Sequence, residues 1–404
     1  MTRKKLFAGI ALSAMMLAGT VIGGYAEEAE QTAAAEETVA EEAVAEDAAA
    51  EEAVAEEAAE TGAAAEESTD SDSNEMVRSF LTGKLVPASI GRARPIAVML
   101  NNIADALPQS GISNAEIVYE APVEGAITRL LGIFEDYQDI ERIGSVRSCR
   151  EYYVYFAREF EATYLHYGEA VYATGLLNMS DTIRLSGMGD YDLQYDGEGD
   201  VVYYRSDDFV TPHNVFTNYD MIQAGLEYKG YSTEYSDEYL ESGHYQFASD
   251  DEVVTLDAGE DALVVKPGYA YNYPEFVYDS ETGKYTRYQL GDVQIDYYTQ
   301  KALTYDNIIL QYCSWVKWDD NGYLDIDVYS GGSGKYITRG KAIDITWTKD
   351  DADSSDRYAD GNFGVTHYYD SDGNEITLNQ GKTWVCIILD TEADAITIEG
   401  TTAE

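Results

Sequence analysis

A long acidic segment without a lysine or arginine limits most strongly where this chain can build a core. Residues 27–75 hold nineteen Asp and Glu and no basic residue, with a drifting repeat EETVA EEAVA EDAAA EEAVA. Five residues advance a helix by about 500°, so the apolar positions spiral around it instead of forming one face. The segment repels itself and stays solvated, although Ala and Glu favour local helix. We therefore expect residues 27–76 to be a disordered tether.

The N-terminus predicts export from the cytoplasm. A basic start, MTRKK, precedes the apolar run LFAGIALSAMMLAGTVIGG and the small-residue site Gly24-Tyr25-Ala26. This order is typical of a secretory signal peptide, here residues 1–26. We expect a secreted, extracytoplasmic protein of the cell envelope. Membrane contact is expected only if the leader stays uncleaved, because the apolar run is then just long enough to span a bilayer.

The remaining chain is also acidic, which excludes several partners. Residues 77–404 carry 23 Lys and Arg against 56 Asp and Glu, a formal charge of −33. Nucleic acid and anionic membrane surfaces are therefore not expected as partners. Three cysteines are too few for a disulfide framework, although Cys313 and Cys386 could pair if the fold brings them together. The length is sufficient for two domains with their own cores.

Arginine and lysine are divided unevenly along this part of the chain. Residues 77–228 contain ten Arg and one Lys, whereas residues 229–404 contain three Arg and nine Lys. Arginine binds carboxylate or phosphate through two parallel hydrogen bonds and stays charged when buried, whereas lysine suits open surface. The first half therefore uses its cations for recognition or internal networks, and the second half for solubility.

Residues 77–228 predict a mixed α/β domain. Alternation and apolar runs indicate strands and short helices in succession, which favours a mixed sheet covered by helices. Ser148 and Glu151 fit a capping box, so a helix is expected to begin just after Ser148. The expected elements are strands at 94–100, 117–134 (two, joined through Gly125), 162–168 and 201–205, and helices at 149–160 and 171–179.

Residues 256–404 predict a mostly antiparallel β domain, reached through a polar, Tyr-rich connection at 229–255. Eight β-rich stretches follow one another: ALVVK, VQIDYY, IILQYCSWVKW, LDIDVYS, KAIDITWTK, THYYD, ITL and TWVCIILD. The dipeptides Asn321-Gly322 and Asp372-Gly373 favour tight hairpin turns. The expected fold class is α+β, an N-terminal mixed α/β domain followed by a mostly antiparallel β C-terminal domain.

Several motifs in order resemble the YerB-like lipoprotein family, whose two domains carry the label domain of unknown function 3048. They include RPIAVMLNN, PQSGISNAEIVYEAPVEGAITRLLGIF, ERIGSVRS, YLHYG, PHNVFTN, SGGSGKY and LNQGKTW, between residues 81 and 389. The resemblance implies little about activity, because the family has no settled function. Family members commonly carry a lipid-attachment cysteine, which this leader lacks. The family also usually has a small, non-nucleophilic residue in place of Cys149, which argues against a catalytic cysteine.

The stretch GSVRSCREYY suggests an anion site. A Gly/Ser turn entering a helix points backbone N–H groups outward, and the helix dipole adds positive charge there. We expect arginines of this region to converge on that spot, together with the PHN motif. The predicted ligand-binding residues are Arg129, Arg142, Ser145, Arg147, Ser148, His213 and Asn214. The alternative is a buried network in which the arginines pair with Glu116, Glu120, Glu124 and Glu151.

Two histidines form the second constellation. His166 or His213, with Glu120 or Glu124, could provide a general acid/base pair for hydrolysis. The alternative is that each histidine is a hydrogen-bonded structural residue. No metal is expected, because no His-x-x-x-His or equivalent spacing is present. No cofactor is expected either, because SGGSGKY lacks the first glycine and the final Ser/Thr of a phosphate-binding loop.

Three functions therefore remain open after the sequence. The leading hypothesis is an envelope binding module whose arginine-lined pocket recognises an acidic small molecule, a wall polymer or an envelope protein. The second is a hydrolase of envelope material that uses His166 or His213 with a glutamate. The third is a structural interaction protein whose polar network only stabilises the fold.

Overall fold

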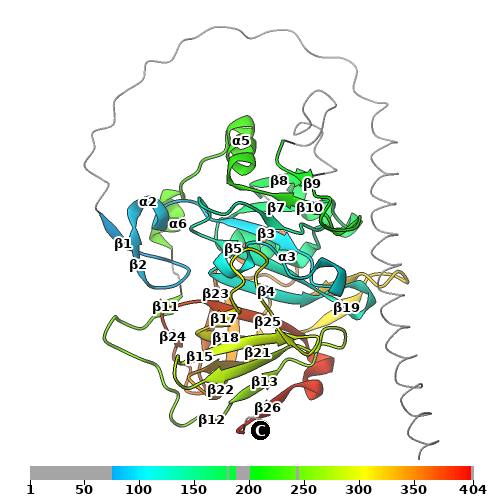
Figure 1. Cartoon of the computed structure of the whole chain (residues 1–404). Coiled ribbons are helices and arrows are strands. Elements are labelled where there is room, and N and C mark those ends of the chain that lie inside the picture. Colours follow the sequence, from blue (N-terminus) through cyan, green and yellow to red (C-terminus); the bar gives the residue numbers. More distant parts are fainter. Residues whose placement is uncertain (1–74, 180–181, 188–200, 243–244, 402–404) are drawn as a thin grey trace, which may run out of the picture.

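The computed structural model describes residues 75–179, 182–187, 201–242 and 245–401 (Figure 1). The predicted leader at 1–26 and the predicted tether at 27–76 lie outside these residues, apart from Glu75 and Met76, where the first strand begins. Within the described ranges, no helix is long and apolar enough to cross a membrane.

One mixed sheet of eleven strands runs through both halves of the chain (Figure 1). Its strands are, in spatial order, β12 (Glu260–Asp261), β22 (Lys341–Lys349), β21 (Gly332–Thr338), β18 (Asn307–Cys313), β25 (Thr383–Leu389), β4 (Ile117–Pro122), β5 (Thr128–Phe134), β3 (Ile96–Leu100), β7 (Thr163–Tyr167) and β8 (Arg184–Gly187), with β23 (Thr366–Tyr369) beside β22. The halves join where β25 pairs in parallel with β4, from Thr383 opposite Ile117 to Cys386 opposite Glu120.

Two cores cover the two faces of this sheet, and each contains residues of both halves. Neighbouring strand residues point to opposite faces, so Tyr119 and Val385 enter one core while Val118 and Trp384 enter the other. The first core includes residues of α3 (Glu151–Glu159) and α4 (Val171–Met179). The second includes α5 (Tyr219–Lys229) and residues of a second sheet. The central strands are buried along their whole length because both faces of the sheet are covered, and the few polar residues among them, Glu120, Thr128 and Arg129, have hydrogen-bond partners inside the protein.

The second half is mostly antiparallel, as predicted, and it contributes a six-stranded sheet packed on the large one. Its strands are β16 (Asp292–Val293), β15 (Lys284–Gln289), β14 (Glu275–Asp279), β13 (Val264–Lys266) and β26 (Thr397–Glu399), with β17 (Thr304–Tyr305) beside β15. The dipeptide Asn321-Gly322 lies in the loop between β19 (Trp315–Lys317) and β20 (Leu324–Ile326), and Asp372-Gly373 lies in a turn after β23.

The smaller elements complete the fold. They are β1 (Met76–Arg78), β2 (Leu85–Pro87), β6 (Ile143–Gly144), β9 (Tyr204–Arg205), β10 (Val215–Thr217), β11 (Gln246–Phe247), β24 (Thr377–Leu378), the α-helices α2 (Ala88–Gly91) and α6 (Asp237–Glu241), and the 3-10 turns Ala104–Ala106, Ile112–Asn114, Glu124–Ala126, Asp360–Phe363 and Asp390–Ala395. β6, β10 and β9 form a separate three-stranded sheet.

Most elements predicted for the first half are present, but the strand expected at 201–205 is limited to Tyr204–Arg205, and the predicted start of α3 is wrong. The helix at 171–179 and the two strands joined through Gly125, whose φ is 73°, are confirmed. The capping box is not formed: α3 begins at Glu151, its N-cap is Arg150, and no side chain caps it. The Glu151 carboxylate accepts hydrogen bonds from distant Arg357 and Trp318, so it does not reach back to its own helix terminus.

Two expectations for the second half and its cysteines are also corrected. The strand expected at 293–298 is limited to Val293, because the Asp296 carboxylate accepts backbone N–H groups of Tyr298 and Thr299 and turns the chain. Cys313 and Cys386 are free, buried thiols. They lie on adjacent strands but three residues out of register, roughly 10 Å along the strand, which is beyond disulfide reach.

Candidate functional site

The segment 145–149 lies at the carboxyl edge of the parallel strands β3, β7 and β8. Its backbone bonds to both neighbours: the Arg147 N–H donates to the Met99 carbonyl at 3.0 Å, and the Arg147 carbonyl accepts from Tyr167 at 3.1 Å. Ligands of open α/β sheets bind beyond the carboxyl ends of such strands. The predicted Gly/Ser turn therefore lies at an edge where a site is commonly built.

Three arginines in or beside this segment donate hydrogen bonds to other groups of the protein. Arg129 Nη1 donates to the Ser148 carbonyl at 2.8 Å, and Arg147 Nη1 donates to the Pro212 carbonyl at 3.1 Å. Arg150 forms a buried ion pair with Glu124, with Nη2 to Oε2 at 2.7 Å. For Arg150 the internal-network alternative therefore describes the geometry.

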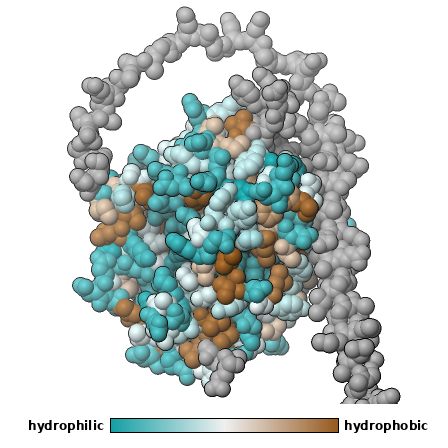
Figure 2. All heavy atoms as spheres, in the orientation of Figure 1, coloured by the Kyte–Doolittle hydropathy of each residue, from teal (hydrophilic) through white to brown (hydrophobic). Residues whose placement is uncertain are grey.

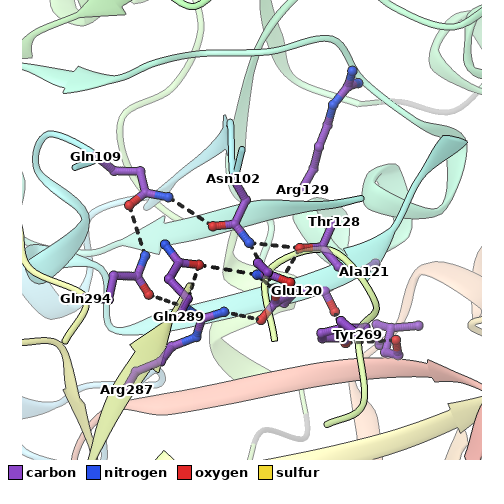
Figure 3. A network of polar contacts seen from close by, with 12 residues as sticks. Asn102, Gln109, Glu120, Ala121, Thr128, Arg129, Tyr269, Arg287, Gln289 and Gln294 are labelled. Atoms are coloured by element: carbon purple, nitrogen blue, oxygen red, sulfur yellow. Dashed lines mark hydrogen bonds and ion pairs between the residues drawn. The ribbon is translucent and has the colours of Figure 1, made fainter. Parts of the chain in front are cut away.

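Glu120 is paired with an arginine that the sequence analysis did not single out. Its Oε2 accepts from Arg287 Nη2 at 2.7 Å, and neither side chain is exposed. Its Oε1 accepts from Asn102, Thr128 and Asn272 at 3.1, 2.8 and 3.0 Å (Figure 3). The carboxylate is thus fully occupied, with partners from both halves of the chain.

This buried network continues through glutamines. Arg287 Nη1 donates to Gln289 and Gln294, and Gln294 Nε2 donates to Gln109 Oε1 at 2.9 Å (Figure 3). The guanidinium also lies 4.3 Å from the ring centroid of Trp384. Burying an ion pair is tolerated best when its remaining donors and acceptors are hydrogen bonded. Most of them are bonded here, and Arg287 Nε, Asn272 Oδ1 and Gln289 Nε2 are the exceptions. The network therefore fastens the second half to the first.

The sequence pattern of β15 indicates that Arg287 is buried. In β15 the buried residues alternate with partly exposed ones, so that Tyr285, Arg287 and Gln289 share the inner face. An arginine on the apolar register of a strand indicates a buried partner.

His166 is held by two hydrogen bonds. Its Nδ1 donates to the Gly168 carbonyl at 2.8 Å, and its Nε2 lies 2.9 Å from Ser186 Oγ. The same carbonyl accepts the Cys149 N–H at 2.9 Å. His166 is fully buried.

His213 lies by the end of the neighbouring strand β3. Its Nδ1 accepts from Asn101 Nδ2 at 2.9 Å, and the Asn101 N–H donates to the Ser145 carbonyl at 2.9 Å. The next residue, Asn214, accepts from Arg205 Nη1 at 2.8 Å. Ser145, Arg147 and His213 thus meet at one corner, while Ser148 and Arg129 lie on the side of His166.

Arg142 has a different environment, an aromatic cage. Its guanidinium carbon lies 4.5 Å from the ring centroids of both Phe216 and Tyr297, 5.1 Å from Tyr298 and 5.7 Å from Phe209. We call these four rings with Arg142 the Arg142 cage. Two rings come from the first half and two from the second. The predicted convergence of Arg142 with Arg129 is therefore replaced by a site at the junction of the halves.

The polar partners of Arg142 include two serines, the hydroxyls of Tyr204 and Tyr297, and one acid. Nε donates to Ser110 Oγ at 3.1 Å, and Nη1 donates to Asp208 Oδ2 at 2.7 Å, with Ser206 Oγ at 3.5 Å. Arg142 is 4% exposed, whereas the Asp208 side chain is 55% exposed. The hydrogen bond from Arg142 lowers the pKa of the Asp208 carboxyl below its ordinary value, so Asp208 is an anion at neutral pH.

Local backbone contacts hold the cage in place. Gly144 has a φ of +149°, and a side chain there would meet the Phe216 ring and the Val215 carbonyl, so the turn before Ser145 requires glycine. The Tyr297 N–H donates to the Gln109 carbonyl at 2.8 Å. Since the Gln109 side chain belongs to the buried network, the cage is braced by the same contacts that join the halves.

Neither a nucleophilic cysteine nor a metal site is supported by the described residues. The Cys149 thiol is completely buried, and burial raises its pKa, so it stays protonated at neutral pH. Among the described residues, no group of three or more His, Cys, Asp or Glu could hold a metal ion.

Comparison with known proteins places the chain in a family. Residues 81–232 match the N-terminal domain, and residues 264–385 the C-terminal domain, of the protein of unknown function DUF3048. The chain belongs to the DUF3048 family. It is 32% identical over 329 residues to the protein named "Putative lipoprotein YerB" of Bacillus subtilis, covering 80% of this chain and 90% of that relative.

A solved structure shows the same fold. The crystal structure of the YerB protein from Bacillus subtilis matches with a TM-score of 0.67 and 30% identity, covering 80% of this chain and 99% of that one. The resemblance drawn from the motifs is thereby confirmed. In this DUF3048 protein the Arg142 cage takes residues from both matched domains, since Phe209 and Phe216 belong to the first and Tyr297 and Tyr298 to the second.

Proposed function

We propose that this DUF3048 protein is a binding protein of the cell envelope that takes an acidic ligand at Arg142. The envelope location rests on the relative named a lipoprotein and on the leader-like residues 1–26. The binding role rests on the geometry of the Arg142 cage.

The observation that carries the proposal is a mismatch of burial between Arg142 and its partner. Buried charges normally have a partner that is equally buried. Three ion pairs of this protein follow that rule, with both side chains at most 3% exposed: Arg150–Glu124, Arg287–Glu120 and Lys349–Glu159. Arg142 departs furthest from it, because its one carboxylate partner among the described residues, Asp208, is 55% exposed. In the pairs Arg94–Glu161, Arg357–Glu151 and Lys284–Asp306, which also have one buried member, the other side chain is at most 34% exposed. A buried guanidinium facing a solvent-exposed acid has the arrangement of an anion receptor.

The rings of the cage strengthen this assignment. Aromatic faces attract a guanidinium and shield it from water, which strengthens its hydrogen bonds to an anion in the remaining plane. Arginine stacked in this way keeps its charge and its fixed fork of donors. Gathering rings from both domains around one arginine also makes binding sensitive to how the domains are joined.

Thermal unfolding of the full chain tests the proposal. The unfolding temperature should rise with the concentration of an acidic ligand, such as a muropeptide or a glycerol phosphate oligomer. At a ligand concentration of a hundred times Kd, binding should add about 2.7 kcal/mol to the free energy of unfolding. The rise should vanish in Arg142→Ala and persist in Arg158→Ala, a matched control in which the arginine stacks on Phe363 at 4.0 Å. A rise that survives in Arg142→Ala would disprove the site.

A second candidate function, hydrolysis, has one observation in its favour. Ser186 Oγ lies 2.9 Å from His166 Nε2, and the imidazole is oriented by the Gly168 carbonyl, which is the geometry of an activated serine. Ser186 is 3% exposed, so access to substrate is not evident. A fluorophosphonate probe should label the wild type and not Ser186→Ala if this pair is catalytic. An unlabelled wild-type protein with intact fold would leave the pair a structural one.

A further inference from the structure

We infer that Asp208 occupies the place of the ligand's acidic group, and that the ligand presents a single carboxylate next to an apolar group. This inference rests on the proposed binding function and specifies the class of ligand.

Access to the guanidinium is restricted to one edge. Ser110 Oγ occupies Nε, and four rings surround the guanidinium with centroids between 4.5 and 5.7 Å away. Asp208 Oδ2 sits on Nη1 at 2.7 Å and reaches the solvent, since its side chain is 55% exposed. An external acid therefore meets Arg142 at the position that Asp208 fills.

Asp208 is held weakly enough to be displaced. Its carboxylate accepts from Arg142 and from the Ser206 hydroxyl, and its backbone N–H donates to Ser206 Oγ at 3.2 Å. The residues around it are largely exposed, including Val210 at 64%. An ion pair with an exposed partner contributes little stability, because water and salt screen it. Replacing it with another carboxylate exchanges one such contact for another.

The local charge favours a monoanion. Arg142 provides one positive charge to this edge, and its polar partners besides Asp208 are neutral hydroxyl groups, those of Ser110, Ser206, Tyr204 and Tyr297. Asp207 and Glu141 are adjacent in sequence and add negative charge. A phosphate monoester carries about −1.5 to −2 at neutral pH. At Arg142 Nη1 an incoming carboxylate replaces one negative charge with one, whereas a phosphate would place a second, uncompensated charge there.

The rim of the site is apolar and comes from both domains. Val210 is 64% and Tyr298 45% exposed, and Phe209 lies next to Tyr297 with ring centroids 6.1 Å apart. Figure 2 shows one face of the molecule, on which hydrophilic residues are mixed with scattered apolar patches. A ligand whose carboxylate is attached to an apolar group would cover the side chains of the rim as it replaces Asp208.

Calorimetric titration of the full chain with three probes tests the inference: N-acetyl-leucine, its amide and glycerol phosphate. We expect N-acetyl-leucine to bind, the amide not to bind, and glycerol phosphate to bind at least about tenfold more weakly. Asp208→Asn should bind N-acetyl-leucine at least about tenfold more tightly, because an internal competitor reduces apparent affinity by the fraction of open sites. Asp250→Asn, which removes an exposed acid paired with Arg78, should change nothing.

The outcomes separate the ligand class from the binding function. Glycerol phosphate binding more tightly than N-acetyl-leucine, and losing that binding in Arg142→Ala, would overturn the carboxylate assignment and leave the acidic site standing. No binding of either acid by Asp208→Asn, in a variant that unfolds at the wild-type temperature, would overturn both. Equal affinity of wild type and Asp208→Asn for N-acetyl-leucine would refute the role of Asp208 as a stand-in.

Discussion

Replacing Glu120 with glutamine tests whether the buried network fastens the two halves of the chain. Glu120 and Arg287 are both completely buried, and they lie in different domains of the family. Glutamine keeps an oxygen for Asn102, Thr128 and Asn272 but turns an amide nitrogen toward Arg287. Arg287 is then a buried cation without its counter-ion.

The expected loss is large compared with the stability of a domain. Removing one partner of a buried ion pair destabilises by about 3–5 kcal/mol, because the remaining charge is uncompensated. The free energy of unfolding of most domains is only about 5–15 kcal/mol. Adding Arg287→Gln should recover about 2 kcal/mol, since residues in one network couple by amounts of this order.

Urea unfolding followed by tryptophan fluorescence measures this loss, and Trp384 next to Arg287 provides a local signal. Asp250→Asn is the matched control, because the Arg78–Asp250 pair also joins the two halves but has both side chains about half exposed. It should cost less than about 1 kcal/mol. A Glu120→Gln loss as small as the control would refute the reasoning that this network holds the halves together.

Two further predictions concern buried groups outside the network. Burial raises the pKa of Glu135 to about 7, so the folded state holds a proton that the unfolded chain releases, and stability falls by about 3 kcal/mol between pH 4.5 and 7. Glu135→Gln lacks this titration, so its free energy of unfolding relative to the wild type should increase as the pH rises from 4.5 to 7. Urea unfolding at several pH values measures this difference. Parallel pH profiles of the two proteins would contradict the raised pKa of Glu135. Burial also raises the pKa of the thiols of Cys149, Cys313 and Cys386, so iodoacetamide at pH 7 should modify all three in urea and none in the native protein, as read by mass spectrometry. Rapid native alkylation of Cys149 would contradict its burial.

Local patterns predicted the elements whose causes are local. The helix Val171–Met179 and the pair of strands hinged at Gly125 follow from short-range periodicity and from one positive φ, and the structure contains both. The cap at Ser148 was wrong for a distant reason, because Glu151 bonds to Trp318 and Arg357, each more than 160 residues away. Sequence spacing does not record such a partner.

The candidate site divides in the same way. The sequence identified Arg142 as a recognition residue, but its cage requires Phe209 and Phe216 from one domain and Tyr297 and Tyr298 from the other. Those four residues meet because parallel pairing of β25 with β4 brings the halves together. The arginine motifs indicated the region of the proposed site, and the long-range sheet determined which arginine lies among rings of both domains beside an exposed acid.

A crystal structure of Asp208→Asn grown with N-acetyl-leucine tests the central claim most directly. We expect density for the ligand carboxylate at the place of Asp208 Oδ2, which lies 2.7 Å from Arg142 Nη1 in the present structure. The leucine side chain should contact the exposed side chains of Val210 and Tyr298. The claim would be contradicted if the side chain at position 208 still contacts Arg142 in this variant while N-acetyl-leucine, at saturating concentration, is absent or bound elsewhere.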